Sequence, residues 1–319
     1  MSVLKKSIKT ARLSVFSNIS LTLGKLFVGI CVGSISIISE AAHSLIDLVA
    51  SLMAYFAVKE SSKPEDKQHP YGYGKFENVS GTIEAFLIFI AAIYIVYEAL
   101  YHLLNPSKIR MPVVGVLVML FSACVNFFIS KKLFVAAKEV DSVAIEADAW
   151  HLRTDVYTSL GVMLALFVIT VCDFFYPKIN IYWLDSIAAI FVASIIIKTA
   201  YKLIIKSSKD LFDVSLPEDE VKFIEGIIHS NTYISGYHAL KTRKAGNKRF
   251  IEFHILVRPQ MSVLQSHDIT RQMKLQISEK FENTSVTIHV EPCDNTCTLK
   301  CQEGCLIKRC NIENIKGSV

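Results

Sequence analysis

The 319-residue chain lacks several patterns that mark common functional classes. It has no HExxH sequence and no glutamate base beside its His-Asp pairs, which argues against a membrane zinc hydrolase. Its polar C-terminal third has no basic stripe with interleaved aromatic residues, so no nucleic-acid partner is expected. Its eight cysteines include no CxxC pair. No cleavable signal peptide is visible, because the apolar stretch after Met1–Arg12 continues directly into the next one.

Charge is also scarce, whereas hydrophobic residues are abundant. Charged residues make up 20% of the chain and hydrophobic residues 52%, which favours a membrane protein. The apolar residues form six runs, each near the roughly 20 residues that cross a ~30 Å hydrocarbon core: 13–32, 36–58, 79–104, 112–137, 143–172 and 182–205. We expect a six-helix transmembrane domain over 1–206, a small cytoplasmic domain over 207–292 and a cysteine-rich tail over 293–319.

The basic residues are distributed unevenly between the loops. Fourteen Lys and Arg residues lie before the first run, after the second, and around the ends of the fourth and sixth. The opposite side has only Lys108, Arg110 and Lys178. The positive-inside rule therefore places both termini in the cytoplasm. The short loops and the lack of a histidine-rich stretch look prokaryotic, so a cell (inner) membrane location is expected.

Two His-x-x-x-Asp pairs lie inside apolar runs: His43/Asp47 in the second run and His151/Asp155 in the fifth. Residues four apart share one face of a helix. A carboxylate in mid-membrane costs on the order of 3 kcal/mol, so it is rarely there without a partner or a task. Two facing helices would offer two imidazoles and two carboxylates, a set that accepts Zn²⁺. A structural hydrogen bond between helices is the alternative for each pair taken alone.

The region after Asp213 predicts a small α+β domain of order αββαβ. Its expected elements are a helix over 218–230, a hairpin of strands 237–244 and 249–257, a helix over 263–281 and a strand over 285–290. This order indicates an open-faced sheet with helices on one side.

Five residues of this domain could bind metal: His238, His254, His267, His289 and Glu291. His289 and Glu291 are two apart, so they share one face of a strand. Each residue alone could instead be a polar side chain on an exposed strand face. The tail adds Cys293, Cys297, Cys301, Cys305 and Cys310, whose spacing falls in the loose range of zinc ligands. Idle thiols and iron–sulfur binding are the alternatives for the tail.

Several segments together resemble the cation diffusion facilitators, a family that exports divalent metals. They are GSISIISEAAHSLIDLVASL, HPYGYGKFENVSG, DAWHLRTDVYTSLGV, GYHALKTRKAG, RFIEFHILV, SHDIT and TIHVEP. The resemblance extends over residues 13–292. It implies a homodimer of six-span protomers with a metallochaperone-like cytoplasmic domain. It also implies a secondary active transporter, not an enzyme, that exchanges metal for protons across the bilayer.

The resemblance places the transport site on His43, Asp47, His151 and Asp155. Histidine in both pairs looks like the zinc-preferring members, so Zn²⁺ is expected as the substrate and as a regulatory ligand. The five cytoplasmic-domain residues match the family's binuclear metal site by position. An exporter of iron, manganese, cobalt or cadmium is the alternative within the family. A membrane metal sensor without coupled transport is the alternative from another class.

Two further matches concern the cytoplasmic side. Asp66 and His69 match two ligands of a metal site that some family members have in this loop. Tyr73 stands where the family often has a histidine, and neutral tyrosine is a poor zinc ligand; a solvated loop histidine is the alternative for His69. Lys75 and Asp213 match a charge interlock of the family, although either alone reads as a surface charge.

Overall fold

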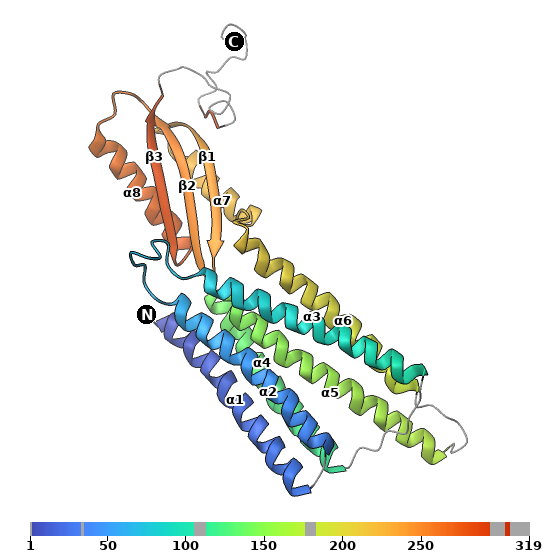
Figure 1. Ribbon diagram of the computed structural model, residues 1–319. Coiled ribbons are helices and arrows are strands. Elements are labelled where there is room, and N and C mark those ends of the chain that lie inside the picture. The colour runs from blue at the N-terminus through green and yellow to red at the C-terminus, as the bar shows by residue number, and fades with distance from the viewer. Residues whose placement is uncertain (1, 33–34, 105–112, 176–182, 294–303, 307–319) are drawn as a thin grey trace. The chain divides into compact units, whose positions relative to one another are not determined.

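The computed structural model describes residues 2–32, 35–104, 113–175, 183–293 and 304–306 (Figure 1). The chain divides into two compact units, Met1–Leu211 and Phe212–Val319. The last helix of the first unit continues to Leu211, five residues beyond the boundary expected from the sequence at 206. Each unit is described by itself.

Six long helices make up the described part of the first unit: α1 (Ser2–Val32), α2 (Ile35–Ser61), α3 (Lys75–Leu104), α4 (Val113–Val140), α5 (Val143–Phe175) and α6 (Trp183–Leu211). By length and composition, four described stretches could cross a membrane: Ile8–Cys31, Lys75–Leu104, Val116–Val140 and Ser186–Leu211. The other two helices, α2 and α5, are the ones that carry Asp47 and Asp155 within their length.

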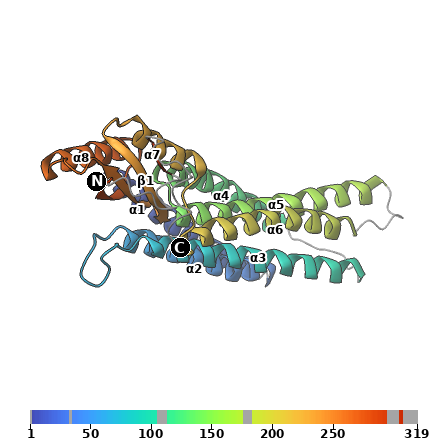
Figure 2. The ribbon, with the colours of Figure 1, turned by 90° about the horizontal axis from the view of Figure 1, so that it is seen from above.

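Small residues let these helices approach one another closely. Both views show α3 and α6 running side by side (Figures 1 and 2), with Ala92 and Ala200 buried in one cluster. A Cβ atom on Gly81 of α3 would lie 3.1 Å from the Val143 side chain of α5. Large side chains such as Phe191 are exposed. Small residues inside and large apolar residues outside are typical of helices packed in lipid.

Hydrogen bonds join α3 to α2, to the residue before α5 and to α6 at the end of the bundle where α3 and α5 begin. The buried Glu77 carboxylate of α3 accepts from the Ser61 hydroxyl of α2 at 2.5 Å and from the Ser142 hydroxyl before α5. Asn78 donates to Asp210 of α6 at 3.0 Å. These bonds fix α2, α3 and α5 relative to one another at one end, which limits how the polar residues farther along α2 and α5 can face each other.

The second unit contains α7 (Glu218–Ser230), β1 (Ile234–Ala245), β2 (Lys248–Val257), α8 (Val263–Lys280) and β3 (Thr284–Pro292). The strand order is β1-β2-β3. β1 and β2 are antiparallel, whereas β2 and β3 are parallel and are connected through α8 (Figure 1). α8 begins with a capping box, in which the Ser262 side chain accepts from the Gln265 amide and the Gln265 side chain accepts from the Ser262 amide.

Both helices of this unit cover the same face of the sheet. Ile251, Phe253 and Ile255 of β2 are buried in one core with residues of α7 and α8. Because side chains alternate along a strand, His254 lies on the opposite face. One face of the sheet is therefore a hydrophobic core, and the other is left for polar residues.

Candidate metal sites

The first site lies between α2 and α5. His151 Nε2 of α5 is 3.0 Å from Asp47 Oδ1 of α2. One ligand atom each from Asp47, His151 and Asp155 lies within 4.8 Å of the others. Asp47 is buried, and the other two are half-buried. His43 lies one turn before Asp47 in α2, and its side chain lies outside the described residues.

Neighbouring helices supply polar contacts around this site. Asn126 Nδ2 of α4 donates to Asp155 Oδ2 at 3.4 Å. Lys25 Nζ of α1, a buried ammonium, donates to Ser44 Oγ of α2 at 2.7 Å. The sequence signals Asn126 only as an amide within an apolar run. The Asn126 bond orients a candidate ligand in the way that outer-shell partners do in metal sites, and the Lys25 bond joins α1 to α2 beside this site.

The donor set determines what this site can hold. The two carboxylates supply the negative charge that neutralises a divalent cation. The one described imidazole supplies a nitrogen donor, which suits zinc and its neighbours in the periodic table. Ionisable groups within the helices of a transmembrane domain pair with one another or mark an ion pathway.

The second site is a row of histidines on the open face of the sheet. His238 of β1 is paired with His254 of β2, and His254 with His289 of β3. The ring centroids are 4.9 Å and 4.8 Å apart along the row. The register of the three strands thus places the three imidazoles side by side.

Glu291 approaches all three imidazoles. Its carboxylate is 2.9 Å from His254 Nδ1, 3.4 Å from His238 Nε2 and 3.5 Å from His289 Nε2. Ligand atoms of His238, His254 and Glu291 lie within 4.8 Å of one another. The pairing of β1 shifts just after His238, where Ala239 has φ 51°. Such a bulge redirects neighbouring side chains at a cost in backbone strain.

His267 does not join this row. It is exposed on α8, a helix that packs on the other face of the sheet. Among the described residues, no group of three metal-ligand side chains includes it. The family resemblance implies that His267 joins the other four residues in one site; within the described single chain it lies apart from them.

The tail cysteines are only partly within the described residues. Cys297, Cys301 and Cys310 lie outside them. The Cys293 amide donates to the Val257 carbonyl at 2.7 Å, which extends the end of β3. Cys305 forms a β-bridge with Gly236, and the Tyr237 amide donates to the Gly304 carbonyl at 3.0 Å. Residues 304–306 thus add a short strand segment to the β1 edge of the sheet.

The loop between α2 and α3 uses Asp66 to hold a turn. Asp66 accepts from the Tyr73 hydroxyl at 2.6 Å and from the His69 amide at 2.7 Å. The Tyr73 hydrogen bond is the main cause that lowers the pKa of Asp66, and the same bond raises the pKa of Tyr73. His69 Nδ1 is 3.8 Å from the carboxylate. Tyr73 therefore acts here as a donor to Asp66.

Lys75 and Asp213 belong to different units. Within the first, Lys75 Nζ donates to the Leu211 carbonyl at 3.5 Å. Within the second, Asp213 accepts from Arg243 at 3.4 Å. The charge interlock between them stays a prediction.

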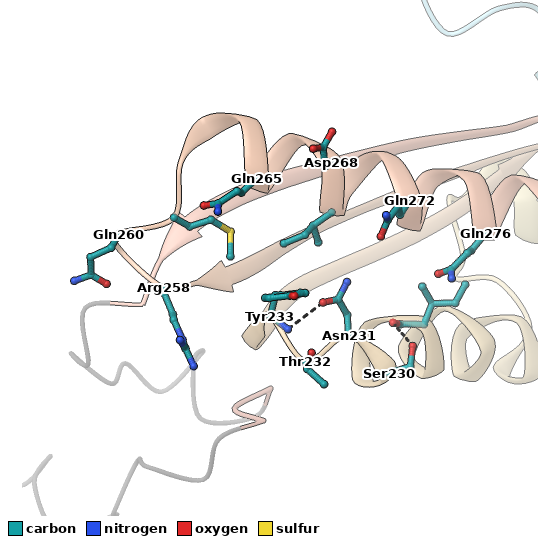
Figure 3. Close-up of a pocket in the computed structure, with 13 residues that line it drawn as sticks. Ser230, Asn231, Thr232, Tyr233, Arg258, Gln260, Gln265, Asp268, Gln272 and Gln276 are labelled. Carbon is teal, nitrogen blue, oxygen red and sulfur yellow. Dashed lines mark hydrogen bonds between the residues drawn. The ribbon is translucent and has the colours of Figure 1, made fainter.

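A hollow of about 630 Å³ lies where α7 ends and α8 begins (Figure 3). Amides and hydroxyls such as Asn231, Tyr233, Gln265 and Gln272 line it, together with Arg258 and Asp268. None of its lining residues is a histidine or a cysteine. It is therefore distinct from the histidine row.

Comparison with known proteins identifies the family. Residues 11–212 match the model of the cation efflux transmembrane domain, and residues 216–293 match that of the cation efflux protein cytoplasmic domain. The chain belongs to the cation efflux family, the cation diffusion facilitators. The predicted fold class, a helical transmembrane domain followed by a small α+β cytoplasmic domain, is confirmed.

Individual proteins are also similar to this chain. An uncharacterized transporter of Synechocystis, sll1263, is 32% identical over 82% of this chain and 83% of its own length. The cation-efflux pump FieF of Escherichia fergusonii is 30% identical, covering 86% of this chain and 88% of the pump. A solved metal-bound C-terminal domain of the CzcD transporter from Thermotoga maritima is 30% identical over 25% of this chain and 93% of that domain, with a TM-score of 0.24. The two family-model matches, together with sll1263 and FieF, show that the chain is a multi-pass membrane transporter of divalent cations, not an enzyme.

Proposed function

We propose that this protein exports Zn²⁺ from the cytoplasm in exchange for protons. The ion is held by His43, Asp47, His151 and Asp155, between α2 and α5. The observation that carries the proposal is the 3.0 Å contact of His151 with Asp47 across these two helices, with Asp155 within ligand distance of both.

The chemistry of the donors favours zinc as the substrate. Imidazole suits zinc, whereas oxygen-only sites suit harder ions such as manganese. Two carboxylates and neutral imidazoles leave no net charge once a divalent cation is bound, which removes most of the cost of holding the ion inside the membrane. Cadmium, with similar ligand preferences, is the expected competitor; iron, manganese and cobalt should bind more weakly.

The proton exchange follows from the same residues. In the metal-free site, His151 shares a proton with Asp47 across their hydrogen bond. Zn²⁺ displaces this proton, because a metal-bound imidazole must be deprotonated. After α2 and α5 open toward the outside, a more acidic medium protonates the histidines and releases the ion. The protonated site then returns and completes the cycle.

The cytoplasmic unit would bind metal as a regulator. His238, His254, His289 and Glu291 supply three imidazoles and a carboxylate on a preformed sheet face, and a homodimer would join two such units. Metal bound there would bias the transport cycle through a coupling free energy between the two sites. The tail cysteines and the Asp66 loop are further candidate metal ligands.

The proposed setting is the inner membrane of a bacterium, with both termini in the cytoplasm. The Lys and Arg excess on the loops supports this orientation. Lys75 and Asp213 would then lie on the cytoplasmic side, where a charge interlock between them could form.

Zinc uptake into proteoliposomes under an imposed pH gradient tests the transport proposal. The native chain should move zinc at a rate that follows the gradient. Asp155→Asn should abolish uptake, whereas Asp219→Asn, an exposed carboxylate on α7, should leave it intact. Uptake that persists in Asp155→Asn, or that ignores the gradient, contradicts the mechanism. Binding without any uptake would favour a metal sensor instead.

A further inference from the structure

Glu84 of α3 is a buried carboxyl group outside the proposed transport site. Its exposed fraction is 0%. Within the part of the chain that the structure describes, neither of its carboxylate oxygens has a hydrogen-bond partner. A carboxyl group that is both buried and unpartnered costs several kcal/mol, so it needs a ligand or a task.

Asp148 of α5 is a second group of this kind. Its exposed fraction is 1%, and its Oδ1 has no hydrogen-bond partner among the described residues. Ala85 and Ala147, the neighbours of Glu84 and Asp148 in sequence, are buried in one cluster between α3 and α5. Asp148 interacts electrostatically with Glu84, and His151 interacts with both carboxyl groups. The Ser14 side chain of α1 also approaches Asp148, although its buried hydroxyl makes no hydrogen bond of good geometry in the described structure.

The two carboxyl groups lie on one side of the transport site. Asp148 precedes His151 by three residues, which is an axial rise of about 4.5 Å toward the start of α5. α3 begins at the same end, since Gly81 contacts Val143 at the start of α5. In the proposed orientation this end is cytoplasmic, so an ion on its way to His151 would pass Glu84 and Asp148 first.

We propose that Glu84 and Asp148 form an inner cation station through which the divalent ion reaches the transport site. This inference rests on the proposed function and adds a second binding site to it. Two carboxylates neutralise one divalent cation, and the Ser14 hydroxyl offers a further oxygen. An oxygen-only set holds zinc less tightly than a set with imidazole. The ion therefore leaves the station for the nitrogen-containing site, and the affinity gradient points along the path of export.

Mn²⁺ is a suitable probe of the station, because an oxygen-only site accepts it and its electron paramagnetic resonance signal reports binding directly. The background is the full chain with the transport site and the histidine row disabled by Asp47→Asn, Asp155→Asn, His254→Ala and Glu291→Gln. Asp66→Asn disables the candidate loop site, and the thiolates of the tail are poor ligands for Mn²⁺. This chain should bind one Mn²⁺. Adding Glu84→Gln should weaken binding at least tenfold. Adding Glu98→Gln, an exposed carboxylate on the same helix, should leave it unchanged.

Zinc uptake by otherwise native chains is the second measurement. Glu84→Gln should lower the initial rate at low zinc about tenfold, and Asp148→Asn should do the same. Glutamine is nearly isosteric with glutamate and removes a buried ionisable group, so the melting temperature should not fall. Equal Mn²⁺ binding with and without Glu84→Gln, or native uptake by both single variants, overturns the proposal. If the native chain moves no zinc, the transport proposal fails, while the Mn²⁺ measurement still decides whether the station exists.

Discussion

Replacing Glu291 by glutamine should weaken zinc binding to the cytoplasmic unit more than any other single carboxylate change in that unit. Glu291 is the only described carboxylate within 3.5 Å of the histidine row. It supplies the negative charge of a set otherwise made of neutral imidazoles. Glutamine has nearly the same shape, so the change removes the charge and leaves the side-chain volume.

The distances set the expected magnitude. Only the contact with His254, at 2.9 Å, has the length of a strong hydrogen bond; those with His238 and His289, at 3.4 Å and 3.5 Å, are longer. Glu291→Gln thus removes one charged ligand and one orienting bond. Loss of an orienting outer-shell partner alone costs roughly 10- to 100-fold in metal affinity, which is about 1.4–2.7 kcal/mol of binding free energy, and loss of the ligand charge should add to this cost.

Calorimetric titration of the full chain with Zn²⁺ measures this change. Asp47→Asn and Asp155→Asn are included in every sample to silence the site between α2 and α5. Glu252→Gln is the matched control, because Glu252 is an exposed carboxylate on β2, two residues from His254 and on the same sheet face. The zinc-dependent rise in melting temperature should shrink in parallel with the affinity.

Two results would refute the reasoning. Equal zinc affinities for Glu291→Gln and the parent chain would show that the carboxylate is not a ligand. An equal loss in Glu252→Gln would show that any negative charge near the row has the same effect.

Three further predictions concern the cytoplasmic unit. Burial and the Glu225 carboxylate raise the pKa of Tyr237, so the stability that this phenol contributes is present below pH 10 and is lost as the pH rises through the raised pKa. An ultraviolet titration of the native chain, with Tyr237→Phe as the reference, measures this pKa. Glu225→Gln should return the pKa of Tyr237 only part of the way to its ordinary value, since burial is the larger cause. Gly304→Ala should detach residues 304–306 from β1, because the added Cβ would lie 1.7 Å from the Tyr237 carbonyl oxygen, and hydrogen exchange of the Tyr237 amide should accelerate. Gly226→Ala is the control, because its Cβ would have no atom within 4 Å. It should leave that exchange slow and stabilise α7 by about 1 kcal/mol. Ser262→Ala should remove the capping box of α8 and lower the unfolding free energy of this unit by about 1 kcal/mol, seen as a lower melting temperature; an unchanged value would mean that the cap contributes nothing.

Local patterns in the sequence were enough to predict the elements. Six apolar runs indicated the six long helices, and the helix expected over 218–230 is α7, Glu218–Ser230. The expected strand 237–244 begins earlier in the structure, at Ile234. Its first residues pair with the end of β2, and strand ends depend on a partner that lies elsewhere in the chain.

Periodicity also assigned side chains to faces of their own elements. Asp47 and His151 were each placed on one helix face, and His289 and Glu291 on one strand face. Periodicity does not show which residue of another element packs against that face. The 3.0 Å contact of Asp47 with His151 joins residues 104 positions apart, so only the packing of α2 against α5 creates it.

Tertiary structure decided the rest for the same reason. Strand register aligned His238, His254 and His289 in one row, while the packing of α8 on the other face left His267 apart. Helix packing also buried Glu84 and Asp148, which sequence alone could not separate from other charged residues near helix ends. A residue's type and spacing are local properties, whereas its burial and its partners depend on which distant segments the hydrophobic core brings together.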